Sequence, residues 1–203
     1  MSFFAARTRK LSPGAPLFAL ALLALLALAG CGGDDDDGDG ATTTAPSGAP
    51  TAGSAAEMVP DLAALGFRPA AGEAPALETP NTKIAVFEHP SGPVRSLRLD
   101  IALNATLDSA QKQFSTFGDA LRNPPPGLLP AGVKQTDGAP AFQADQSRSY
   151  VTDKPDNQGG FVYTDLHRFG RVVVIMYTIG PKDAATDAVR KQVAELMAGR
   201  APR

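Results

Sequence analysis

Ser109 and Lys112 are a pair whose types and spacing allow covalent chemistry, because in an S-x-x-K motif the lysine can activate the serine for acyl transfer. Enzymes built on this motif also use S-D-N and K-T-G motifs, and the sequence contains neither. We therefore expect Ser109 and Lys112 to lie on the solvent side of a helix rather than in an active site.

The two histidines, His89 and His167, are the next candidates, for metal binding or acid-base chemistry. They lack the i, i+4 spacing that places a zinc-binding pair on one helix face. Hairpins bring distant residues together, so either ring can still meet a carboxylate such as Glu88 or Asp165. Half-exposed strand histidines are the commoner case, and we expect no metal and no cofactor. A hydrolase assembled from scattered Asp, His and Ser residues remains the alternative.

A run of acidic residues offers a possible calcium loop. Asp35, Asp37, Asp39 and Gly40 fit the D-x-D-x-D-G opening of such a loop, but the twelfth position is Pro46 where a bidentate Glu is needed. A solubilising acidic stalk is the better interpretation of this run.

The single cysteine, Cys31, follows an apolar run that begins at Leu17. Arg7, Arg9 and Lys10 precede the run, which has no charged residue. A membrane-spanning helix needs roughly 20 apolar residues, and this run is shorter and ends in small residues, as signal peptides do. The sequence therefore predicts a signal peptide over residues 1–30.

The four residues that end at Cys31 read LAGC and resemble the lipobox of bacterial lipoproteins. This resemblance implies diacylation of the Cys31 sulfur, cleavage before it and acylation of the new amino terminus. Several acyl chains hold a protein stably to a bilayer. We therefore expect a lipid anchor on the extracytoplasmic face of the cell membrane, or in the outer membrane of a cell with two membranes. The rest of the chain has no cysteine, which excludes disulfides and thiolate sites there.

Residues 31–56 contain the lipidated cysteine and a segment made of Gly, Asp, Ala, Thr, Pro and Ser before Glu57. This composition predicts a disordered tether, whose coil dimensions give a reach of roughly 25 to 30 Å. The chain has 19 basic and 21 acidic residues, and the charges balance once the signal and the tether acids are set aside. A neutral domain gives no electrostatic basis for binding nucleic acid.

Residues 57–203 are long enough for one domain. Period-two alternation predicts a strand within 94–103, and residues 82–89 are predicted as another strand, joined to it as a hairpin through the turn at Pro90 to Pro93. Helical spacing predicts a helix from Leu107 to Leu121. Further strands are predicted within 140–153 and 159–180, the latter turning at Phe169-Gly170, and a short one near Leu65. A second helix follows Asp183, with an apolar stripe of Ala185, Val189, Val193, Leu196 and Met197.

This order of elements predicts an α+β domain with a mostly antiparallel sheet of about six strands flanked by two helices. It resembles the PsbP-like fold of extrinsic photosystem subunits and related bacterial lipoproteins, which implies helices flanking a central antiparallel sheet. The resemblance lies in the element order alone and carries no site residue.

Aromatic side chains are concentrated in the predicted strands of the second half. Tyr150, Tyr163, His167 and Tyr177 are candidates to line an apolar cleft between sheet and helix. No catalytic set accompanies them, so the leading interpretation is a non-enzymatic, membrane-anchored envelope lipoprotein that binds a protein partner or a small apolar ligand. The envelope hydrolase is the alternative, and a surface spacer without a binding site is a third possibility.

Overall fold

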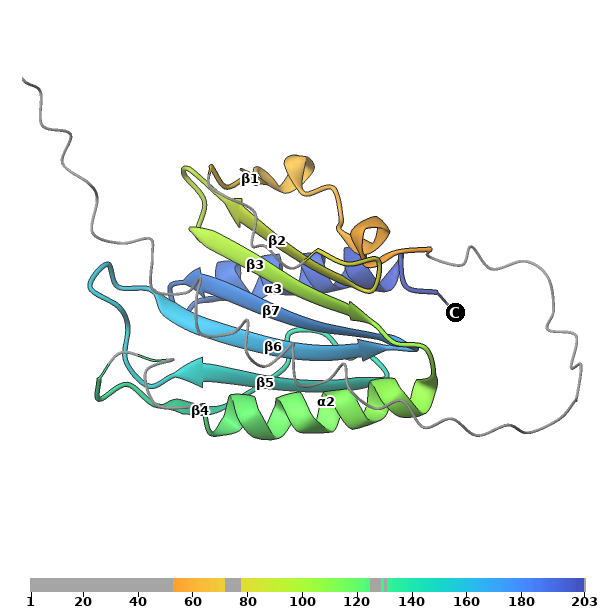
Figure 1. Ribbon diagram of the computed structural model, residues 1–203. Coiled ribbons are helices and arrows are strands. Elements are labelled where there is room, and N and C mark those ends of the chain that lie inside the picture. Colours follow the sequence, from red (N-terminus) through yellow and green to blue (C-terminus); the bar gives the residue numbers. More distant parts are fainter. Residues whose placement is uncertain (1–52, 72–77, 125–128, 130, 203) are drawn as a thin grey trace, which may run out of the picture.

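The computed structural model describes residues 53–71, 78–124, 129 and 131–202, so Cys31, the lipobox and the acidic run at 35–39 lie outside the described residues (Figure 1). The elements follow one another as 3₁₀ helices η1 (Ala55–Met58) and η2 (Ala63–Leu65), strands β1 (Arg68–Pro69), β2 (Thr82–Glu88) and β3 (Ser96–Leu103), helix α2 (Leu107–Arg122), strands β4 (Gln135–Gly138), β5 (Gln146–Thr152), β6 (Phe161–Phe169) and β7 (Val172–Gly180), and helix α3 (Ala184–Ala198). None of these helices is long and apolar enough to span a membrane.

The strands form one sheet in the order β1-β2-β3-β7-β6-β5-β4, and every neighbouring pair is antiparallel. This confirms the predicted α+β class. The described sheet has seven strands rather than about six. The additional strand is β4, whose sequence Gln-Thr-Asp-Gly is short and polar and therefore has none of the apolar alternation that marks a strand. The region near Leu65 is a 3₁₀ turn, and the short β1 follows it.

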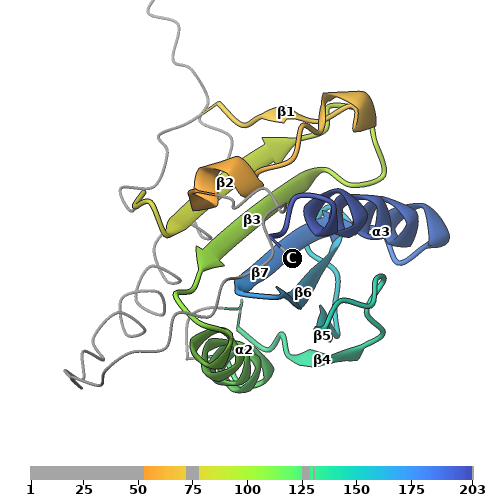
Figure 2. The same ribbon diagram turned by 90° about the vertical axis from the view of Figure 1, so that its right-hand side faces the viewer.

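Helices α2 and α3 lie on opposite sides of the sheet, as the end view shows (Figure 2). Successive side chains of a strand point to opposite faces. Each central strand therefore contributes to two separate cores, one under each helix. Strand β7 lies in the middle of the sheet and is buried from Val172 to Thr178, so its unbroken apolar run is covered on both faces.

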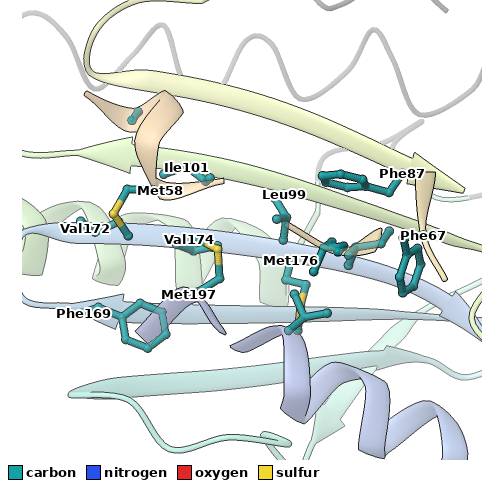
Figure 3. Close-up of a cluster of buried hydrophobic side chains, with 14 of the residues drawn as sticks. Met58, Phe67, Phe87, Leu99, Ile101, Phe169, Val172, Val174, Met176 and Met197 are labelled. Atoms are coloured by element: carbon teal, nitrogen blue, oxygen red, sulfur yellow. The ribbon is translucent and has the colours of Figure 1, made fainter. Parts of the chain in front are cut away.

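The core on the α3 side is the larger of the two apolar clusters (Figure 3). It contains Leu99 and Met176 from neighbouring strands, Met197 from α3, and Met58 from η1. The N-terminal segment therefore adds its own apolar side chains to this side of the sheet, with η1 and the α3 C-terminus meeting where Arg200 donates to the Glu57 carbonyl.

The core on the α2 side is built by one face of that helix. Ala110, Phe114, Phe117 and Leu121 are buried at helical spacing, and they pack with residues of β5, β6 and β7. The Tyr150 hydroxyl of β5 donates to the Gly118 carbonyl of α2 at 2.8 Å, so a hydrogen bond as well as apolar contact fixes the helix on the sheet.

Both long helices begin at the residues that the sequence predicts. Thr106 caps α2 in a reciprocal pair with Ser109, and Asp183 caps α3 by accepting from the Thr186 amide. The predicted apolar stripe of α3 is partly wrong, because Ala185 and Leu196 are exposed. The residues that α3 buries are Thr186, Arg190, Val193, Ala194 and Met197. The helix is rotated so that an arginine, not only apolar side chains, faces the sheet.

We expect Thr106→Ala to lower the free energy of unfolding by about 1 kcal/mol, because it removes the side-chain acceptor for the Ser109 amide at the start of α2. Ser115→Ala, at an exposed position within the same helix, is the matched control and should leave stability nearly unchanged. Urea denaturation followed by circular dichroism measures both. Equal effects of the two substitutions would contradict the assigned cap.

Candidate functional site

The four residues predicted to line a cleft lie on two different faces of the sheet. Tyr163 and His167 lie on the α3 side of β6, two residues before and two residues after Asp165. Tyr150 and Tyr177 pair across the sheet with Thr164, which puts them on the α2 side. The sheet itself therefore separates the two pairs, and a single cleft lined by all four residues does not form.

The most polar region of the interior centres on an ion pair between β6 and α3. Asp165 is fully buried and Arg190 is 3% exposed. Arg190 donates from Nε to Asp165 Oδ2 at 2.8 Å and from Nη2 to Oδ1 at 2.6 Å. Two parallel bonds between a guanidinium and a carboxylate are the strongest geometry that such a pair adopts. The pair therefore fixes both the position and the rotation of α3.

Further groups satisfy the rest of the guanidinium. Nη2 also donates to Ser149 Oγ at 3.0 Å, and Nη1 donates to Asp187 Oδ1 at 2.5 Å within the helix. The guanidinium carbon lies 4.4 Å from the ring centre of Tyr163. Burial alone would lower the pKa of Arg190, but the hydrogen bonds and charge of Asp165 outweigh it and the pKa is raised. Arg190 therefore stays positively charged, and its charge is balanced by Asp165 and Asp187 of the protein itself.

His167 lies on the same face as Asp165 and is 1% exposed. Its Nδ1 is 3.0 Å from Ser147 Oγ, which also accepts a hydrogen bond from the Ala144 amide. Burial lowers the pKa of His167, so the ring is neutral in the folded protein. Ser147 and His167 are the serine and histidine of a possible nucleophilic pair, but the ring is sealed from water.

His89 lies far from His167 along the sheet, in the turn after β2, where its ring packs edge-on against Phe67. Its Nδ1 accepts from the Ser91 amide at 3.3 Å. In the part of the chain that the structure describes, no carboxylate hydrogen-bonds to either histidine, and no group of three His, Cys, Asp or Glu side chains is placed to hold a metal ion. Neither histidine therefore has, among the described residues, the carboxylate partner that a hydrolase would need.

A second buried carboxylate lies on the α2 side of the sheet. Asp100 is paired with Arg98 of the same strand, with Nε and Oδ1 2.6 Å apart. Burial raises the pKa of Asp100 more than Arg98 lowers it. The Tyr177 ring lies beside Arg98, and burial, with the Asp100 charge, raises the pKa of its phenol well above the ordinary value. The Asp100 carboxylate is therefore paired with Arg98, and the Tyr177 phenol stays uncharged within the core.

Ser109 takes part in the cap of helix α2, and Lys112 lies on the solvent side of the same helix. The Ser109 hydroxyl completes the cap by accepting from the Thr106 amide, and Lys112 is exposed. Their arrangement is that of an ordinary helix start.

Sequence reasoning did not single out Arg190, Asp165 or Asp100 as interior residues. The alternation of β3 placed Asp100 on the polar face, and the helical pattern placed Arg190 outside the apolar stripe. The available signal was Asp165 itself, a lone carboxylate between the apolar residues of a strand adjacent to a fully buried one. A buried carboxylate requires a cationic partner, but periodicity alone does not say which arginine supplies it.

The described fold itself defines the class of the molecule, an α+β domain with a seven-stranded antiparallel sheet between two helices. No family model and no curated protein matches the chain. Among solved structures, the extracellular domain of PknH from Mycobacterium tuberculosis is similar at a TM-score of 0.43 and 12% identity, over 68% of this chain and 87% of that one. The function of the chain has to be argued from its own residues.

We expect Asp165→Asn and Arg190→Met each to lower the free energy of unfolding by roughly 3 to 5 kcal/mol, because each leaves a charge buried without its partner. Asp187→Asn is the matched control, since this carboxylate also bonds Arg190 but is 60% exposed, and it should cost no more than about 1 kcal/mol. Chemical denaturation measures all three. A loss from Asp187→Asn as large as that from Asp165→Asn would show that burial does not set the strength of the network.

Proposed function

We propose that the protein is a non-enzymatic envelope lipoprotein, anchored by acyl chains on Cys31, whose domain binds a protein partner or a small apolar ligand. The LAGC sequence supports the anchor, and the tether composition supports a domain held near the membrane without lying on it. We also propose that the domain is PsbP-like, which the order of strands and helices around one antiparallel sheet supports.

The proposal that the protein is not an enzyme is supported by the way the domain uses its reactive side chains, which bond to one another inside the fold. Asp165 and Arg190 are bonded to each other, and His167 is 1% exposed, with half-buried Ser147 as its hydrogen-bond partner. A hydrolase needs its base and nucleophile within reach of water and substrate. These groups stabilise the architecture instead, which leaves binding as the function that the domain supports best.

The lipid anchor is tested by Cys31→Ser in the natural cell, with membrane fractionation and metabolic labelling by an alkyne-tagged fatty acid. The wild type should be labelled and sediment with membranes. The variant should lose the label and leave the membrane fraction, because no other cysteine can carry an acyl chain. A variant that stays as firmly in the membrane fraction as the wild type would contradict the anchor.

The binding function is tested by cross-linking in intact cells, followed by purification under denaturing conditions. We expect one envelope complex to be enriched reproducibly, or an apolar molecule to be retained by the purified protein in native mass spectrometry. The Cys31→Ser variant, released from the membrane, controls for proteins captured only by proximity. The absence of both a partner and a ligand would favour the surface spacer.

The hydrolase alternative is tested by replacing His167, its candidate general base. His167→Gln should leave any hydrolytic activity of the purified protein on ester and amide substrates unchanged, because the ring is 1% exposed and hydrogen-bonds to no carboxylate among the described residues. An activity that His167→Gln abolishes and His89→Gln leaves intact would overturn the non-enzymatic proposal.

A further inference from the structure

The loop from Ala139 to Asp145, between β4 and β5, covers the His167 ring. Phe142 of this loop meets the ring edge-on with centres 6.2 Å apart, and it also packs against Phe169. The loop is partly exposed and contains no helix or strand. Ser147 of β5, Val174 of β7 and Phe169 of β6 also lie beside the ring, and helix α3 packs on the same face of the sheet. The loop has no helix or strand and is tied to α3 by a hydrogen bond of 3.4 Å from Arg190 Nη2 to the Ala139 carbonyl, so its movement is the least costly way for water to reach His167.

The ring and the loop are connected through one hydroxyl. Ser147 Oγ accepts from the Ala144 amide of the loop, so its own proton is available for His167 Nδ1. In the tautomer in which Ser147 donates to Nδ1, the ring carries its proton on Nε2, which is buried and has no hydrogen-bond partner in the described part of the chain. This arrangement suits a neutral ring. A second proton on Nδ1 would point at the Ser147 proton, so the hydroxyl would have to turn and accept from both Nδ1 and the Ala144 amide, while Nε2–H would still lack an acceptor among the described residues.

The charged groups around the ring cannot compensate a second proton. Asp165 of β6 is two residues away on the same face, but both its oxygens are bonded to Arg190 of α3, which is itself a cation. Asp145 of the loop is bonded to the Gly170 amide and paired with Arg168. Strands β5 and β7 present Ser147, Ser149, Val174 and Met176 on this face, none of which is charged. A protonated His167 would therefore be a buried cation without an anion of its own.

We propose that His167 is an acid-sensitive latch, whose protonation releases the Ala139–Asp145 loop and brings Phe142 into contact with water. Opening the loop lets water solvate the charged ring without unfolding the sheet. Because burial lowers the pKa of the folded ring, the closed state is fully stable above the ordinary histidine value near 6.5 and loses stability as the pH falls below it. The latch does not depend on the lipid anchor.

Tryptophan fluorescence in the mature full chain, held in detergent micelles, tests the latch. The sequence contains no tryptophan, so Phe142→Trp places one reporter in the loop. Acrylamide quenching should increase several-fold between about pH 7.5 and about pH 5, across the range in which histidines titrate, while far-UV circular dichroism stays unchanged. Added His167→Gln should abolish the increase, and added His89→Gln should preserve it. An increase that survives His167→Gln, or no increase before the sheet unfolds, would overturn the proposal.

A second measurement covers the case in which His167→Gln fails to fold. The ring of His167 is followed by NMR in the Phe142→Trp protein labelled with ¹³C-histidine, with the His89 signal identified from its variant. Its titration midpoint should coincide with the midpoint of quenching. Clearly different midpoints would show that another group opens the loop.

Discussion

The buried ion pair between Asp165 and Arg190 is the constraint on which the α3 side of the domain depends. A carboxylate in the middle of a sheet is tolerated only with a cation bound to it. Arg190 supplies that cation from the helix, and this requirement sets the rotation of α3, turns Ala185 and Leu196 outward and brings Tyr163 over the guanidinium. The apolar cluster around Met197 then fills the remaining length of the helix.

The two faces of the sheet use their polar groups differently. On the α2 side, Asp100 and Arg98 are neighbours on one strand and can pair before the helix docks. On the α3 side, the polar groups come from β5, β6 and α3 and meet only in the folded domain. His167 lies on the same face beside this network, bonded to Ser147 and covered by the irregular loop. The proposed response to acid therefore involves the α3 side of the domain.

Much of the fold could be predicted from the sequence, since the hairpin of β2 and β3, the buried strand β7 and the caps at Thr106 and Asp183 each depend on local pattern. Strand β4 could not, because it is polar throughout and is held by pairing with β5 alone. The faces of Tyr150 and Tyr163 could not either. They depend on the register between β5 and β6, and a shift of one residue would put both rings on the same face. The rotation of α3 required a contact between residues 25 apart in sequence.

The most direct test of this account is native-state hydrogen exchange of α3 in the wild type and in Arg190→Met. The account predicts that α3 amides of the wild type exchange only with global unfolding, as the amides of β6 and β7 do. In Arg190→Met the α3 amides should exchange through a partial opening whose free energy is lower than that of global unfolding. The α2 amides should keep the same difference from the free energy of global unfolding as in the wild type. Equal relative protection of α3 in both proteins would contradict the claim that the Asp165–Arg190 pair holds this helix on the sheet.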